Sequence, residues 1–334
     1  MDRILQTIGS AGGQLDCLRQ VKKSVIKVGI MAIWPPQYRG QPWDVALAEM
    51  KEYWRVNLEE ILADCPDLVL VPECSDRPQG LTIEQGIEWH RFRGDQMRDF
   101  YSDLARKHHC CFVYSGVRCM EDGTFRNSNQ FINRDGSVVG IYDKHFPMPD
   151  EITKRHIMPG KDPQVIQTEF GKVANAICFD LNFQELLEKY VPQRPDLMVF
   201  CSNYHGGLMR QTWAYRLRCH FLGCFADGGA SVLNPLGEIL ACSSSYHPNL
   251  VTTINLDCLV AHLDENRSRL RALKLKYGGA VNIHDPGYLA PVLITSEDPV
   301  ISARQMAEEF EIESWHHYYA RAVACADKFR DIQI

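Results

Sequence analysis

Short apolar runs alternate along the chain with longer segments in which apolar residues recur every three or four positions. Runs of the first kind are typical of buried strands, and segments of the second kind are typical of amphipathic helices. The pattern predicts strands at 24–32, 67–73, 111–117, 129–132, 138–142, 196–201, 230–233 and 238–242, and helices at 45–64, 85–108 and 186–190. This alternation favours a layered α/β domain.

Two of the predicted strand pairs flank strong turn signals. Asp135-Gly136 separates the runs 129–132 and 138–142, and Asn234-Pro235-Leu236-Gly237 separates 230–233 from 238–242. Both segments carry the residues that tight hairpin turns favour. We therefore expect two antiparallel hairpins at these positions.

Three apolar runs stop at a chemically reactive side chain. The run from Asp67 ends at Glu73, the run from Val138 leads to Lys144, and Ala176-Ile177 leads directly to Cys178. Ligands of α/β sheets gather at the carboxyl ends of the strands. A carboxylate, an amine and a thiol placed there are expected to converge on one pocket.

The segments around these residues resemble the motifs of the nitrilase superfamily of carbon–nitrogen hydrolases. Pro72-Glu73 is similar to its Pro-Glu signature, Tyr142-Asp143-Lys144-His145 to its lysine block, and 177–185 to its cysteine block. The order Glu, Lys, Cys is also that of the superfamily, and the likeness covers roughly residues 25 to 260. The resemblance implies a four-layer αββα sandwich and a homodimer or larger even-numbered oligomer.

The three residue types also define a reaction. A thiol with an ordinary pKa near 8.5 is largely protonated at neutral pH, so attack by Cys178 on an amide carbon requires a base. Glu73, partly desolvated at a strand end, is the expected base. The Lys144 ammonium and the backbone N–H of Phe179 are the expected partners of the oxyanion. This chemistry requires no metal and no organic cofactor, and the sequence predicts no metal site.

The resemblance suggests two further site residues. Members of the superfamily often add a second glutamate after the lysine, and Glu151 is the expected residue, with Asp150 as the alternative. Asn203 follows a predicted strand at a spacing from Cys178 that resembles the N-carbamoyl-amino-acid hydrolase branch, where an asparagine contacts substrate. An asparagine that caps a turn is the alternative interpretation of this residue.

The residues that follow Cys178 bear on the substrate. Phe179-Asp180 stands where true nitrilases carry Trp-Glu, which favours an amide or carbamoyl substrate over a nitrile. Carbamoylases also carry arginine close behind this segment, whereas this chain has Leu181 and Asn182. Three arginines elsewhere are candidates for a substrate carboxylate: Arg155, Arg210 and Arg218. The alternative to an enzyme is a catalytically idle scaffold that keeps the fold to bind a partner or a metabolite.

The composition limits which partners the protein is expected to bind and in which compartment it is expected to occur. The net charge is -6, and no long basic stretch is present, so a nucleic-acid partner is not expected. No apolar run is long enough to cross a membrane, which also disfavours the membrane-embedded acyltransferase branch. The 13 cysteines are an odd number without regular spacing. Because an odd number cannot all pair within the chain, a reducing, cytoplasmic location is expected.

The chain is expected to consist of an N-terminal extension at 1–23, a carbon–nitrogen hydrolase domain at 24–280 and a C-terminal extension at 281–334. The first thirty residues lack a continuous apolar stretch of signal-peptide length. In the extension, Met306, Phe310 and Tyr319 are expected to lie in a C-terminal helix that packs on the body or on a partner subunit.

Overall fold

The computed structural model describes residues 24–330, so the predicted extension at 1–23 lies outside the described residues. Contacts between Cα atoms divide the chain into two compact units, one of which is Ile26–Leu256 and the other of which includes the chain from Asp257 onward. The sequence analysis placed this boundary at residue 280. The segment 257–280 groups with the C-terminal unit because its strand and helix pack against later elements of that unit.

The first sheet of the larger unit has the strand order β12-β1-β2-β3-β4-β5. Strands β1, β2 and β3 are parallel, and β3, β4 and β5 form an antiparallel meander. The bounds are β1 Val25–Met31, β2 Leu68–Leu70, β3 Cys111–Cys119, β4 Phe125–Ile132, β5 Val138–Asp143 and β12 Asn249–Asn255. The hairpin predicted around Asp135-Gly136 is confirmed by the pairing of β4 with β5.

The second sheet has the order β11-β10-β9-β8-β7-β6. Strands β7, β8 and β9 are parallel, and the other neighbours are antiparallel. The bounds are β6 Ile166–Thr168, β7 Gly171–Ile177, β8 Leu197–Ser202, β9 His220–Phe225, β10 Gly229–Leu233 and β11 Ile239–Cys242. The second predicted hairpin is therefore also confirmed.

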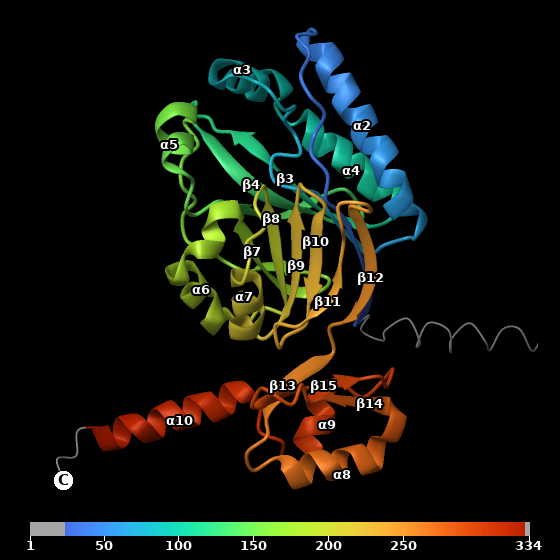
Figure 1. Cartoon of the computed structure of the whole chain (residues 1–334), viewed down its shortest axis with the longest axis vertical. Coiled ribbons are helices and arrows are strands. Elements are labelled where there is room, and N and C mark those ends of the chain that lie inside the picture. The colour runs from blue at the N-terminus through green and yellow to red at the C-terminus, as the bar shows by residue number, and fades with distance from the viewer. Residues whose placement is uncertain (1–23, 331–334) are drawn as a thin grey trace, which may run out of the picture. The chain divides into compact units, whose positions relative to one another are not determined.

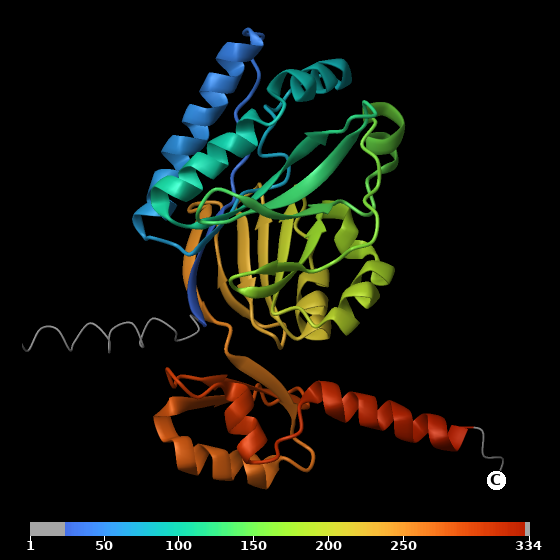
Figure 2. The ribbon, with the colours of Figure 1, turned by 180° about the vertical axis from the view of Figure 1, so that it is seen from behind.

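Helices cover the outer faces of the two sheets, which makes a layered arrangement of helix, sheet, sheet and helix (Figures 1 and 2). Helices α2 Trp43–Ala63 and α4 Gln96–His108 pack on the first sheet, and α6 Gln184–Tyr190 and α7 Met209–Leu217 pack on the second. The predicted αββα sandwich is confirmed. The remaining helices of this unit are α3 Ile83–Arg93 and α5 Pro149–Arg155, with 3₁₀ turns at Cys178–Asn182 and Val191–Gln193.

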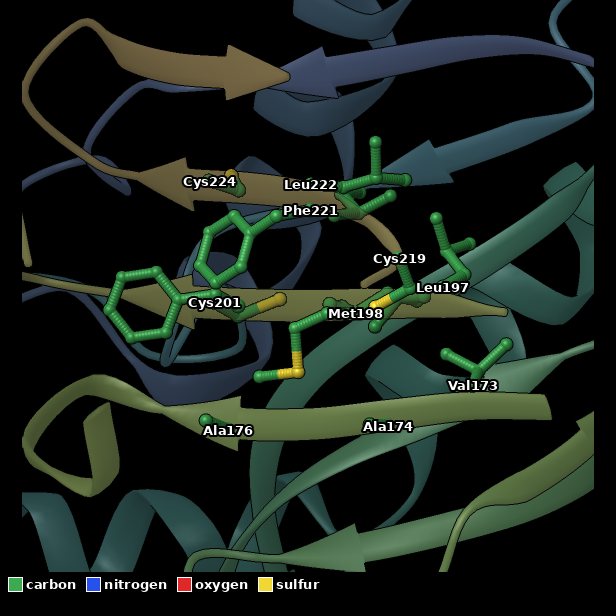
Figure 3. Close-up of a cluster of buried hydrophobic side chains, with 14 of the residues drawn as sticks. Val173, Ala174, Ala176, Leu197, Met198, Cys201, Cys219, Phe221, Leu222 and Cys224 are labelled. Carbon is green, nitrogen blue, oxygen red and sulfur yellow. The ribbon is translucent and has the colours of Figure 1, made fainter. Parts of the chain in front are cut away.

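The main core lies between the two sheets. Every residue of β8 and β9 is buried, because one face of each strand meets the opposite sheet and the other meets helices. Figure 3 shows side chains of this core from β7, β8 and β9, among them Val173, Met198 and Phe221. Burial on both faces explains why these strands appear in the sequence as continuous apolar runs.

The single helix predicted at 85–108 is wrong, because the segment forms two helices. Helix α3 ends at Gly94, whose φ of 51° lies in the left-handed region that glycine tolerates best. Its start is marked by a capping box in which Thr82 and Gln85 exchange hydrogen bonds. Helix α4 then begins at Gln96.

The C-terminal unit is built around its own small sheet, with the strand order β13-β15-β14. Its elements are β13 Cys258–His262, α8 Arg267–Tyr277, a 3₁₀ turn at Gly278–Ala280, β14 Val281–His284, β15 Pro291–Ser296, α9 Ala303–Glu309 and α10 Trp315–Arg330. Met306 is buried in the core of this unit, whereas Tyr319 is exposed on α10. The expectation that these residues share one helix is therefore wrong, because the chain turns after Glu309. Among the described residues, no helix is long and apolar enough to cross a membrane.

Candidate active site

The topology brings the three strand-end residues to the same place. Glu73 follows β2 and Lys144 follows β5 in the first sheet, while Cys178 follows β7 in the second. Lys144 Nζ donates to Glu73 Oε1 over 3.1 Å, and Glu73 lies close enough to the Cys178 thiol for its charge to raise the pKa of that thiol. A carboxylate thus lies between the amine and the thiol, as an acid–base relay requires.

Lys144 is 1% exposed and lies between two carboxylates. Besides Glu73, it donates to Glu151 Oε2 over 2.9 Å. Burial acts to lower the pKa of Lys144, but the charges of Glu73 and Glu151 outweigh burial and raise the pKa above its ordinary value. The side chain is therefore a fixed ammonium at neutral pH, as stabilisation of a developing oxyanion requires.

Helix α5 supplies Glu151, the predicted second glutamate. Proline at its first position and the hydrogen bond from Met148 N–H to Glu151 Oε2 over 2.7 Å define the start of the helix. Asp150, the alternative residue, pairs instead with Lys154 Nζ over 2.8 Å at the surface. The structure thus brings Glu151 to Lys144 and Glu73 and keeps Asp150 away from them.

The Glu73 carboxylate, which is 3% exposed, accepts from two further donors. Asn127 Nδ2 donates to Oε1 over 2.8 Å, and the backbone N–H of Asn203 donates to Oε2 over 3.0 Å. Hydrogen bonds to both oxygens fix the plane of the carboxylate. Asn127 is not among the site residues expected from the sequence, because β4 carries several polar residues and their pattern does not single it out.

Cys178 occupies a sharp turn between β7 and a 3₁₀ segment. Its φ of 50° is in the left-handed region, which a residue with a side chain adopts at a cost. Asp180, which is fully buried, stabilises the turn by accepting from Ile177 N–H over 3.0 Å and from Phe146 N–H over 2.7 Å. The strained backbone directs the nucleophile out of the strand and toward the carboxylate.

The environment of the thiol keeps it protonated. Burial raises the pKa of Cys178 to about 12, the charge of Glu73 acts in the same direction, and Lys144 opposes both. At neutral pH the nucleophile is consequently a thiol beside a carboxylate rather than a free thiolate. The arrangement suits proton transfer that accompanies attack.

The two predicted substrate contacts lie beside the triad. Asn203 approaches it through the backbone, since its N–H donates to Glu73 Oε2 and also acts to lower the pKa of Cys178. Phe179 is half-buried, and its ring packs edge-on against Phe183 with centroids 5.2 Å apart. Phe183 in turn stacks on Phe146 at 3.7 Å, so three aromatic rings lie beside the nucleophile and the lysine.

Comparison with known families identifies a matching model. A family described as carbon–nitrogen hydrolase matches residues 24–257, which include all of the residues brought together here. A curated relative, the hydrolase in agr operon of Staphylococcus lugdunensis, is 28% identical over 215 residues, which are 58% of this chain and 89% of the relative. The omega-amidase NIT2 of Homo sapiens is 21% identical over 239 residues, covering 63% of this chain and 86% of that protein.

Solved structures share the fold at low identity. Saccharomyces cerevisiae Nit3, a member of branch 10 of the nitrilase superfamily, superposes with a TM-score of 0.57 at 18% identity, over 71% of this chain and 92% of Nit3. An amidase from Nesterenkonia sp. gives a TM-score of 0.54 at 18% identity, over 76% of this chain and 98% of the amidase. The likeness covers the two six-stranded sheets with their flanking helices, which is the fold of the superfamily.

Proposed function

The chain belongs to the carbon–nitrogen hydrolase family, and from that premise we propose that it hydrolyses linear, non-peptide amides to an acid and ammonia or an amine. The reaction proceeds through a thioester on Cys178. The observation that carries the proposal is the buried ion pair of the Glu73 carboxylate with the Lys144 ammonium beside Cys178, whose pKa the charges of both residues affect. A scaffold that only binds a partner has no need to bury these three groups together.

In the first half-reaction, Cys178 Sγ forms a bond to the amide carbon as Glu73 accepts the thiol proton. The carbonyl oxygen becomes an oxyanion, which the Lys144 ammonium and the backbone N–H of Phe179 stabilise. Loss of one such donor typically raises the barrier by about 3 kcal/mol. The carbon–nitrogen bond then breaks, Glu73 returns its proton to the departing nitrogen, and the acyl group remains on sulfur.

In the second half-reaction, water attacks the thioester carbon and Glu73 accepts a proton from that water. The carbon–sulfur bond breaks, the acid departs, and the sulfur recovers its proton from Glu73. One carboxylate serves both halves because each begins with a proton donor, first the thiol and then water. Glu151 acts here through its charge on Lys144, which keeps the amine protonated.

A second candidate substrate is an N-carbamoyl amino acid, and Arg210 favours it. Arg210 is 8% exposed, and its guanidinium donates to Ser231 Oγ over 2.7 Å and contacts the His205 ring at 2.9 Å. Within residues 24–330 no carboxylate pairs with it, and burial lowers its pKa. A substrate carboxylate would compensate this charge. Arg218, by contrast, donates to the carbonyl of Arg216.

An ammonia-release screen tests the proposal. Purified protein is incubated with short amides, N-carbamoyl amino acids and nitriles, and products are identified by mass spectrometry. We expect turnover of amides or carbamoyl compounds by the wild type and none by Cys178→Ala. The matched control is Cys242→Ala, which changes an exposed cysteine and should keep full activity. Turnover by Cys178→Ala at the wild-type rate would exclude the thioester, and no turnover by the wild type would favour the idle scaffold.

A further inference from the structure

Asn127 of β4 contacts both carboxylates of the site and the backbone of Lys144. Its side-chain Nδ2 donates to Glu73 Oε1 over 2.8 Å and reaches Glu151 Oε1 at 3.5 Å. Its backbone carbonyl accepts from the N–H of Lys144 over 2.8 Å. Next along the strand, Ser128 pairs with Asp143, so this register places Asn127 beside the end of β5.

We propose that Asn127 is a positioning residue. It sets the plane of the Glu73 carboxylate, and it holds the carboxylates of Glu73 and Glu151 at separate positions around the Lys144 ammonium. The inference rests on the proposed function, since it concerns the same acid–base relay. Asn127 acts through Glu73 and does not take part in bond formation. Its amide supplies Oε1 with a neutral donor beside the Lys144 ammonium, while the Asn203 N–H holds Oε2.

The direction in which the Glu73 carboxylate faces depends on which donor binds each of its two oxygens. With Lys144 as the sole donor to Oε1, the carboxylate would rotate to bind the ammonium more closely, since a charged hydrogen bond is stronger than a neutral one. A closer ion pair would turn the carboxylate away from the thiol. The neutral amide opposes this rotation and leaves the carboxylate facing Cys178, whose pKa its charge raises.

The packing of Asn127 shows that its amide does not serve stability. The residue is fully buried, and its Oδ1 has no hydrogen-bond partner within the described part of the chain. A buried acceptor without a donor costs about 1–3 kcal/mol, which an apolar residue of the same size would avoid. A buried polar group that lowers stability is expected at a functional site, where the geometry that the reaction requires takes precedence over stability.

The chain offers a closely matched control in Asn129. It lies two residues along β4, and therefore on the same face of the strand, and it is 1% exposed. Its Oδ1 also lacks a partner among residues 24–330, and its Nδ2 contacts Asn175 Oδ1 at 3.5 Å rather than the carboxylates. Replacement of either asparagine by leucine removes a buried amide and keeps the volume.

The test compares Asn127→Leu with Asn129→Leu and the wild type. On an amide found in the screen, Asn127→Leu should lower kcat about 10- to 100-fold with little change in KM, as expected for a misplaced catalytic group. Asn129→Leu should keep the wild-type kcat and KM. The thermal midpoint of each variant is measured alongside, to show that both variants are folded under the assay conditions.

A second measurement requires no substrate. The charge of Glu73 raises the pKa of the Cys178 thiol, so a Glu73 carboxylate that turns away in Asn127→Leu should speed alkylation by iodoacetamide at pH 8. Equal alkylation rates in Asn127→Leu, Asn129→Leu and the wild type would overturn the positioning role. Equal losses of kcat in both variants would also overturn it. Absence of amide turnover by the wild type would instead overturn the proposed function, since alkylation reports on the positioning alone.

Discussion

The Tyr142 hydroxyl donates a hydrogen bond to Asp180 Oδ2 over 2.7 Å, and both side chains are buried. Tyr142 lies in β5, two residues before Lys144, and Asp180 lies two residues after Cys178. The bond therefore joins the first sheet to the second beside the lysine and the nucleophile. Burial raises the pKa of Asp180, and the donors Ile177 N–H and Tyr142 O–H oppose that effect.

Tyr142→Phe should weaken both the fold and the site. It removes one donor from a buried carboxyl group, at a cost of about 1–3 kcal/mol in the free energy of unfolding. Because the lost bond joins the two catalytic segments, kcat should fall as well. Tyr190→Phe is the control, since its buried hydroxyl accepts from Asn175 N–H, a bond that does not join the two catalytic segments. Urea unfolding and steady-state kinetics check the prediction, and an equal effect of both variants on kcat would contradict it.

Glu151→Gln should lower kcat while leaving the shape of the site intact. The substitution removes a negative charge that raises the pKa of Lys144, so the ammonium is held less firmly. We expect a loss on the order of 10- to 100-fold. Asp150→Asn, in the same turn of α5, should stay within about twofold of the wild type, because Asp150 forms only a surface ion pair with Lys154. Similar rates for both variants would remove Glu151 from the site.

Helix α10 leads us to expect a homodimer or larger even-numbered oligomer. It has no buried residue, and Tyr319, Val323 and Phe329 are 60%, 44% and 63% exposed on one apolar face. A second copy of the chain is the partner that would cover this face. Val323→Glu should therefore lower the mass measured by light scattering at micromolar concentration, and Leu275→Glu, at an exposed position of α8, should not. A monomer mass for the wild type would contradict the prediction.

The sequence was sufficient for the fold and for the reactive groups because both follow from local patterns. Glu73, Lys144 and Cys178 each end an apolar run, and parallel strands place their ends at one edge of a sheet. The family match then supports the same fold independently. No local pattern, however, indicates which polar residues inside a strand face the site, so Asn127 and the anchoring role of Asp180 emerged only from the structure.

Other features escaped the sequence because they depend on the backbone. Asn203 is expected from the resemblance to contact substrate, and the structure adds a role of its backbone, since its N–H donates to Glu73. The break between α3 and α4 depends on the conformation of Gly94 within a segment of helical periodicity. The C-terminal unit has its own core around Leu273 and Ile294, which a division by motif at residue 280 did not reveal.

The roles of Glu73 and Lys144 are separable by alkylation of Cys178, because the two charges act on the thiol in opposite directions. Burial and the charge of Glu73 raise its pKa to about 12, and Lys144 lowers it. Only the thiolate reacts, so the rate for the wild type should rise about tenfold per pH unit from pH 7 to 10 without a plateau. Cys178→Ala provides the background from the remaining cysteines.

Glu73→Gln should lower the thiol pKa and speed alkylation at a given pH, because a neighbouring negative charge and the carboxylate acceptor are lost while Lys144 remains. Lys144→Met should raise the thiol pKa further and slow alkylation, because the opposing positive charge is lost. Amide turnover should nevertheless be lost in both variants, since one lacks the base and the other lacks the oxyanion partner. The two variants should therefore shift the alkylation rate in opposite directions, and both should lose amide turnover. This combination is expected if Glu73 relays the proton of the Cys178 thiol, and it is not expected if Cys178 is already a thiolate. If Lys144→Met left both the alkylation profile and turnover unchanged, Lys144 would lie outside the reaction and the proposed mechanism would be wrong.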